Sequence, residues 1–231
     1  MAGSGGIRID HVMGLFRLWW VPAGGSPVDG AYVRYPSADL LDIVALESHR
    51  AGALVVGEDL GTVEPGVRET LAEHAVLSYR VLWFEDVDPA TWPRSSMAAV
   101  TTHDLPTVAG LWTGTDLAEQ VALGLGTAQA LGVGRDEILG RLTGPAGLAP
   151  DVALDEVVDA AHRMLARATS TLLSATLEDA AGERRRPNVP GSTDRPNWRL
   201  PLPVSVEDLV DHPGAAAIAR ILDEAVRGPT G

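Results

Sequence analysis

The pattern of apolar and polar positions divides the chain into short strands separated by helices. Residues 6–10 form a short strand candidate that ends on a carboxylate, and residues 53–56 are apolar throughout. Such a continuous apolar run suits a parallel strand that is covered on both faces. Residues 76–84, rich in β-branched and aromatic side chains, give a third candidate, and residues 98–102 and 172–177 complete the set. The pattern therefore predicts about five strands.

Helical periodicity fills the segments between the strand candidates. Residues 40–50 predict a helix with Ser37 as its N-cap and Gly52 just past its end. A second helix is expected from about Thr62 to His74, and a third starts at Pro106. Strands that alternate with helices indicate βαβ units and a parallel sheet.

The second half of the chain is predicted to be mostly helical or irregular. Residues 116–168 are expected to form helices, with breaks near residues 132–134 and 144–145. We expect the whole chain, residues 1–231, to form a single domain in which residues 116–168 are a mostly helical insertion. The remaining expectations are a Pro/Gly-rich loop at 21–36, a polar loop at 183–203, and a helix at 206–227 interrupted near 212–214.

Charge and composition restrict the classes of function. The formal net charge is −13, from 18 basic and 31 acidic residues. An acidic chain repels phosphate backbones, so we expect no nucleic-acid partner, and a neutral substrate fits better. The absence of cysteine excludes disulfides, cysteine-ligated metals and a thiol nucleophile, and is compatible with the cytoplasm. No apolar run approaches the ~18 residues of a membrane span, and the first residues do not resemble a signal peptide.

Three acidic residues share one position relative to the predicted sheet. Asp10, Glu58 and Asp104 each follow a strand candidate, at the end where barrels of alternating strands and helices carry their active sites. Paired carboxylates there suit glycoside chemistry, in which one attacks the anomeric carbon and the other protonates the leaving oxygen. A retaining pair lies ~5–5.5 Å apart, and neighbouring strands are ~4.8 Å apart. A third carboxylate can hold sugar hydroxyls as charge develops.

Each of these residues also has a purely structural interpretation. A single acid after a strand is often a helix N-cap or a loop residue, and Asp39 and Asp59 are interpreted in that way. Arg8 points to the same strand face as Asp10, where it would keep that carboxylate ionised and in place, or form only a structural ion pair. His103 would hydrogen-bond a sugar or orient its neighbour. No metal-binding spacing is present, so we expect no metal.

Aromatic and basic residues add two weaker signals. Trp19, Trp20 and Trp198 lie in or near predicted loops, which favours a role as sugar-stacking platforms. Trp83 and Trp112 are expected in the core, and Trp92 is left open. The basic run at residues 183–186 is expected to be a solvated loop rather than a nucleic-acid site.

Five groups of residues in this order resemble the amylomaltases, a family of 4-α-glucanotransferases in the α-amylase clan. The resemblance covers about residues 6–203. The matching segments are Arg8-Ile9-Asp10-His11 with Gly14-Leu15, Gly30-Ala31-Tyr32-Val33 with Tyr35-Pro36, Val56-Gly57-Glu58-Asp59-Leu60-Gly61, Thr102-His103-Asp104-Leu105-Pro106-Thr107, and Asn188-Val189-Pro190-Gly191 with Asn197-Trp198-Arg199.

The resemblance implies a fold and a reaction. The chain would hold strands four to eight of a (β/α)₈ barrel with helical insertions. It would move α-1,4-glucan segments from a maltooligosaccharide or starch-like donor to glucose or a glucan acceptor, without a cofactor. Asp10 would be the nucleophile, Glu58 the acid and then the base, and Asp104 the group that stabilises the transition state. Substrate contacts would come from Arg8, His103 and Asn188.

The resemblance also implies that the first part of the barrel is absent from this chain. We expect the edge of the Asp10 strand to be exposed, and the chain to be poorly stable or to need a partner. Two alternatives to the transferase therefore stay open. One is an α-glucan hydrolase of the same clan, and the other is an inactive, truncated fragment.

Overall fold

The structure, a computed structural model, describes residues 3–149 and 151–228. The chain divides into two compact units, and each is described by itself. Unit 1 consists of residues 1–80, 93–97 and 170–172, and unit 2 of residues 81–92, 98–169 and 173–231.

The main sheet has five strands in the order β1-β4-β5-β6-β7. β1 pairs with β4 in parallel, with Gly6 opposite Leu54 and Ile9 opposite Gly57, and β4 also pairs with β5 in parallel. β1 therefore lies at one edge of this sheet. All five strands match the strand candidates of the sequence to within a few residues: β1 Gly6–Ile9, β4 Leu54–Gly57, β5 Val76–Val81, β6 Ser96–Ala99 and β7 Leu172–Ser174.

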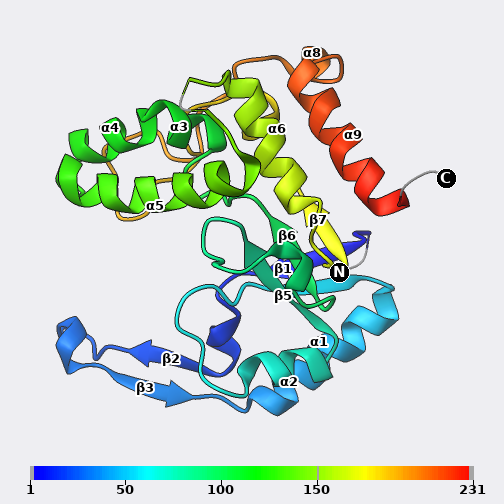
Figure 1. Cartoon of the computed structure of the whole chain (residues 1–231). Helices are drawn as coiled ribbons and strands as arrows, with labels where there is room; N and C mark the ends of the chain where they lie inside the picture. The colour runs from blue at the N-terminus through cyan, green and yellow to red at the C-terminus, as the bar shows by residue number, and fades with distance from the viewer. Residues whose placement is uncertain (1–2, 150, 229–231) are drawn as a thin grey trace. The chain divides into compact units, whose positions relative to one another are not determined.

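Two helices cover the sheet of unit 1 and form its core. α1 (Ser37–Ala51) and α2 (Val67–Glu73) lie together against these strands (Figure 1). Leu41 of α1 and Leu71 of α2 are almost fully buried against Val55 and Val76 of the sheet. The period of the helix thus places its apolar positions on one face, where burial removes them from water.

The helix boundaries differ slightly from the predictions. Gly52 ends α1 in a left-handed conformation, as expected, but Ser37 is the first helical residue rather than the N-cap. α2 begins at Val67, later than predicted, because Gly66 takes a φ of 87° and sets the start of the helix there.

The segment after β1 folds into a hairpin that the sequence did not predict. β2 (Arg17–Trp20) and β3 (Ala31–Arg34) pair antiparallel, with Trp19 opposite Tyr32. Figure 1 shows them as a two-stranded arm separate from the main sheet. The expected irregular loop is present only between the strands, where proline and glycine turn the chain.

Unit 2 is built from helices, of which α6 and α9 carry much of its core. Val157, Ala161 and Leu165 of α6 and Ile218 and Ile221 of α9 are buried, and the two helices pack together. No helix in the described part of the chain is long and apolar enough to cross a membrane. The helices are α3 Val108–Thr113, α4 Thr115–Ala122, α5 Ala128–Ala146, α6 Leu154–Leu165, α7 Leu177–Ala180, α8 Val206–Leu209 and α9 Pro213–Arg227.

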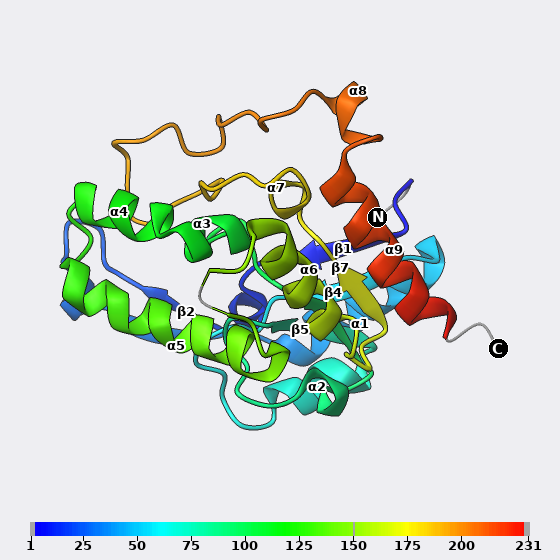
Figure 2. The same ribbon diagram turned by 45° about the horizontal axis from the view of Figure 1, so that its top comes forward.

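The helical region agrees with the sequence pattern except at its breaks. The break predicted near residues 132–134 is wrong, because α5 runs through it. An exposed glycine costs a helix only about 1 kcal/mol, so α5 continues through Gly132 and Gly134. The break predicted near residues 144–145 lies within two residues of the end of α5 at Ala146. The chain also leaves the helical conformation at residues 123–127, between α4 and α5. Figure 2 shows the predicted polar loop at 183–203 as a long irregular segment.

Candidate active site

Asp10 and Glu58 follow the paired strands β1 and β4, and backbone hydrogen bonds continue beyond the strand ends. The Glu58 N–H donates to the Ile9 carbonyl at 2.9 Å, and the Val12 N–H donates to the Glu58 carbonyl at 3.0 Å. The two backbones are therefore fixed in register at the positions that carry the carboxylates. Neighbouring parallel strands bring their carboxyl ends to the same edge, so both side chains lie at one place.

Asp10 is exposed and forms an ion pair with the preceding side chain on its strand face. The Arg8 Nη1 lies 2.6 Å from the Asp10 Oδ1. The guanidinium also stands over the Tyr79 ring, 5.4 Å from its centroid. The predicted contact between Arg8 and Asp10 is thus confirmed, and it follows from the two-residue period of a strand.

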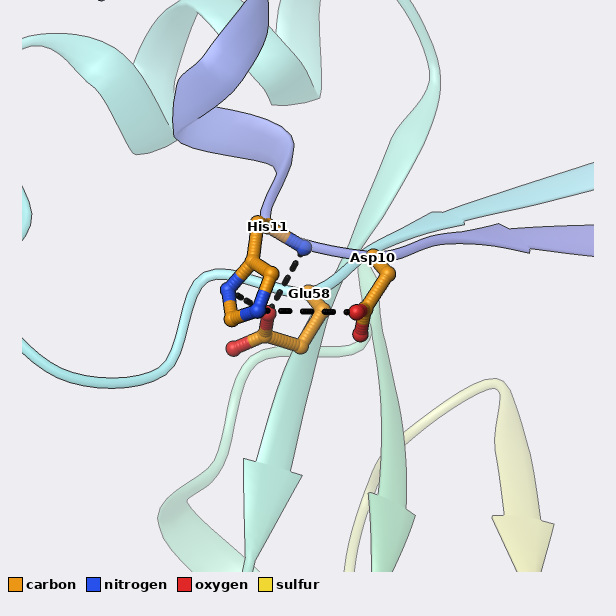
Figure 3. Close-up of side chains that lie close together, drawn as sticks. All are labelled: Asp10, His11 and Glu58. Atoms are coloured by element: carbon orange, nitrogen blue, oxygen red, sulfur yellow. Dashed lines mark hydrogen bonds and ion pairs between the residues drawn. The ribbon is translucent and has the colours of Figure 1, made fainter. Parts of the chain in front are cut away.

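Glu58 is buried, with 6% of its surface exposed, and both carboxylate oxygens accept backbone hydrogen bonds. The His11 N–H donates to Oε2 at 2.8 Å, and the Leu60 N–H donates to Oε1 at 2.9 Å. The His11 ring extends toward both carboxylates, with Nδ1 3.3 Å from Glu58 Oε2 and Nε2 3.6 Å from Asp10 Oδ2 (Figure 3). A backbone φ of 46° at His11 supports this position.

The separation of the two carboxylates is short. One oxygen of Asp10, one oxygen of Glu58 and one ring nitrogen of His11 lie within 4.8 Å of one another. These three residues are the group of histidine and acidic side chains in the described chain that could hold a metal ion. Exposed acids commonly gather in this way without an ion, and the expectation that no metal is needed stays a prediction.

Tyr79 places an uncharged side chain beside Asp10, His11 and Glu58. Burial of the β5 side chain raises the pKa of its hydroxyl, the positive charge of Arg8 partly opposes this rise, and the negative charge of Glu58 adds to it. With a pKa raised above the ordinary value of a tyrosine, Tyr79 is neutral at pH 7. It therefore contributes no charge of its own to Asp10 and Glu58.

In unit 2, Asp104 is held by an asparagine from a distant part of the chain. The Asn188 Nδ2 donates to the Asp104 Oδ1 at 2.7 Å, and the Asn188 N–H donates to the His103 carbonyl at 3.0 Å. The His103 Nε2 lies 3.5 Å from the same Asp104 oxygen. The sequence singled out all three residues, and the structure brings them together although 84 positions separate Asp104 from Asn188.

A buried ion pair between Arg186 and Asp116 also contacts the backbone of Asp104. Arg186 binds both oxygens of Asp116 at 2.7 and 2.6 Å, and its remaining nitrogen donates to the Asp104 carbonyl at 2.6 Å. The side chains of Arg186 and Asp116 are 8% and 7% exposed. The paired planar geometry makes such a contact strong and directional. It fixes the backbone of the residue that carries the third carboxylate.

A family model described as 4-alpha-glucanotransferase matches residues 1–206. The chain belongs to the 4-α-glucanotransferase family. The 4-alpha-glucanotransferase of Mycobacterium tuberculosis is 44% identical over 98% of this chain and 34% of its own length. That of Haemophilus influenzae is 38% identical over 84% of this chain and 31% of its own length. The chain thus spans about a third of the length of these curated relatives.

Solved structures show the same fold. The crystal structure of amylomaltase from Corynebacterium glutamicum aligns with 95% of this chain and 36% of its own, at a TM-score of 0.86 and 33% identity. Amylomaltase from Streptococcus agalactiae, solved in complex with acarbose, aligns with a TM-score of 0.71 at 18% identity. The expectation of a partial (β/α)₈ barrel in this 4-α-glucanotransferase family member is therefore confirmed.

The sequence missed the contacts of several residues in and around the candidate site. His11 was noted in a motif but given no role, although its backbone and ring both contact Glu58. Arg186 was interpreted as part of a solvated basic loop, and this is wrong, because it is buried against Asp116. Asp59 was interpreted as an N-cap or loop residue. It is fully buried and instead bonds Arg68 at 2.6 Å and the Tyr79 N–H at 2.8 Å.

Proposed function

We propose that this chain carries the catalytic groups of a 4-α-glucanotransferase. It would transfer α-1,4-glucan segments from maltooligosaccharide or starch-like donors to glucose or glucan acceptors. The observation that carries the proposal is the approach of Asp10 and Glu58 oxygens to within 4.8 Å at the ends of two paired strands. Retaining glycoside chemistry needs carboxyl groups about 5–5.5 Å apart, whereas inversion needs about 6.5–9.5 Å.

Asp10 fits the role of nucleophile in this reaction. Its carboxylate would attack C1 of the donor sugar while the bond between C1 and the glycosidic oxygen breaks, which gives a covalent glucosyl-enzyme. The carboxylate is exposed, and the ion pair with Arg8 orients it. Arg8 would thereby support the first sugar position as well.

Glu58 fits the role of acid and then base. It would give its proton to the departing glycosidic oxygen, and later take a proton from the acceptor hydroxyl as that oxygen attacks C1 and releases Asp10. Burial of the side chain and two backbone N–H donors hold it in a single orientation. A fixed carboxyl group lowers the reorganisation needed in each step.

Asp104, His103 and Asn188 would bind the sugar hydroxyls. The Asp104 carboxylate, already oriented by Asn188, would stabilise the positive charge that develops on the sugar ring. We propose that residues 1–231 work as one partial barrel domain with residues 116–168 as its helical insertion. We propose no cofactor. A cytoplasmic location is proposed as well, because a chain without cysteine is compatible with a reducing compartment.

Product analysis with maltotriose tests the proposal. Purified chain is incubated with maltotriose, and the products are separated by chromatography, with Asp10→Asn as the matched variant. A ladder of longer and shorter oligosaccharides that falls at least about 10³-fold in the variant supports the transferase, since the nucleophile is required for every turnover.

The other outcomes decide between the alternatives. Shorter products without longer ones would indicate an α-glucan hydrolase and refute the transferase. A chain that is folded by circular dichroism yet gives no products would show that residues 1–231 are not sufficient for activity. Adding the first part of a related barrel as a separate polypeptide would then show whether those strands restore it.

A further inference from the structure

Trp198 has a backbone conformation that bulky residues avoid. Its φ is 62°, in the left-handed region, although it is neither glycine nor asparagine. A bulky side chain in this region is a genuine outlier, because its Cβ approaches the following carbonyl oxygen. Such strain persists only where the surroundings impose it, and it is concentrated at functional sites.

Hydrogen bonds made by the Trp198 N–H and by the preceding side chain impose this conformation. The Trp198 N–H donates to the Pro187 carbonyl at 3.0 Å. The preceding side chain, Asn197, accepts from the Val189 N–H at 3.1 Å and from the Arg195 Nη1 at 3.0 Å, and it donates to the Ser192 carbonyl at 2.7 Å. The turn is therefore built rigidly around a strained residue.

This rigid turn presents the indole to solvent rather than to the core. Trp198 is 64% exposed, so its burial does not stabilise the fold in compensation for the strain. The ring lies against the His103 imidazole, with 4.9 Å between centroids and 43° between planes. His103 precedes Asp104, and Asn188 binds both of these residues. The exposed indole thus belongs to the Asp104 group.

We propose that Trp198 is a preformed stacking platform for one glucose ring of an α-glucan beside Asp104, an inference that rests on the proposed function. The flat C–H face of a pyranose matches the apolar face of an indole, and neither carries a charge. The hydroxyl groups at the edge of the same sugar would then meet the hydrogen-bonding groups of His103, Asp104 and Asn188. Because the turn already holds the ring, binding orders little further.

Trp198→Gly tests this role without confusing it with folding. Glycine adopts a positive φ without strain, so the substitution removes the ring and relieves the backbone together. Binding of maltoheptaose to the full chain is measured by isothermal titration calorimetry, and the Tm by circular dichroism. We expect the Kd to rise by about tenfold or more, while the Tm stays the same or rises.

Two further variants separate stacking from general loss of apolar surface. Trp198→Phe keeps a smaller flat ring, and its affinity is expected to lie between those of the unaltered chain and Trp198→Gly. Leu177→Ala removes an apolar side chain that is 56% exposed in the same unit, and it is expected to leave the affinity unchanged. Affinities that decrease from the unaltered chain to Trp198→Phe to Trp198→Gly would support stacking.

The outcomes distinguish this inference from the proposed function. Three results would each contradict the stacking role of Trp198. They are an unchanged affinity in Trp198→Gly, a lowered Tm in that variant, and no binding of maltoheptaose by the unaltered chain. Products from maltotriose are scored separately on the same preparations. Binding that depends on Trp198 without any product ladder would support the platform and count against the transferase activity of this chain.

Discussion

Replacing Arg186 by methionine tests whether the buried ion pair holds the Asp104 loop together. The substitution keeps much of the side-chain volume but removes the positive charge. It takes away two bonds to Asp116, at 2.7 and 2.6 Å, and one bond to the Asp104 carbonyl, at 2.6 Å. Asp116 keeps only the Gln120 amide, 2.7 Å away, as a side-chain partner among these contacts.

The expected loss of stability is large because the Asp116 carboxylate stays buried without its positively charged partner. The Asp116 side chain is 7% exposed, so water cannot replace the guanidinium without local unfolding. Removing one member of a buried pair typically costs about 3–5 kcal/mol. For a chain of 231 residues, about 2–4 °C of Tm per kcal/mol gives a fall of roughly 6–20 °C.

A double-mutant cycle with urea unfolding provides the measurement. Arg186→Met and Asp116→Leu are each expected to destabilise unit 2, whereas the two together should recover most of the loss, because no unpaired charge remains. The transition is followed by circular dichroism at the helix band, since α3 to α6 lie in unit 2. A loss below about 1 kcal/mol in both single variants, or additive losses in the double variant, would refute the reasoning.

Two further substitutions probe the hairpin and the core of unit 2. In Gly30→Ala, the new Cβ would lie 2.3 Å from the Trp19 Nε1, so we expect a local loss of about 1–3 kcal/mol. Hydrogen exchange of β2 and β3 measures it, with Gly132→Ala, which meets open space, as the control. Burial raises the pKa of Asp179, an effect that the nearby His162 partly opposes. Its protonated form therefore stabilises the fold, and this stability is lost as pH rises from about 4 through the higher folded pKa. Asp179→Asn should then raise the Tm at pH 7 but not at pH 4, and a lower Tm at pH 7 would contradict this.

The sequence by itself determined the elements of the main sheet and the positions of the carboxylates. A continuous apolar run predicted the strand at residues 53–56, because a covered parallel strand needs apolar residues on both faces. β-branched and aromatic side chains predicted the strand at residues 76–84. Asp10, Glu58 and Asp104 could be singled out as candidates because strand ends are local features, and barrels carry their active groups at that end. The contact between Arg8 and Asp10 could also be predicted, since residues two apart in a strand share a face.

The hairpin of β2 and β3 was decided by tertiary structure rather than by an apolar pattern. Trp19, Trp20 and Tyr32 remain 47%, 57% and 56% exposed, so neither strand has the alternation of buried and exposed residues that predicts a strand. Its pairing depends on cross-strand contacts, such as the edge-to-face packing of Trp19 on Tyr32.

The long-range contacts of the candidate site could likewise not be predicted from the sequence. Arg186 meets Asp116 across 70 positions, and Asn188 meets Asp104 across 84. The sequence showed which residues carry charge but not which charge each would meet. The left-handed turn at Trp198 follows from bonds made by Pro187, Val189 and Ser192. Hydrophobic periodicity and strand position are properties of neighbouring residues, whereas the partner of a buried charge and the conformation of a loop depend on segments that only the folded chain brings together.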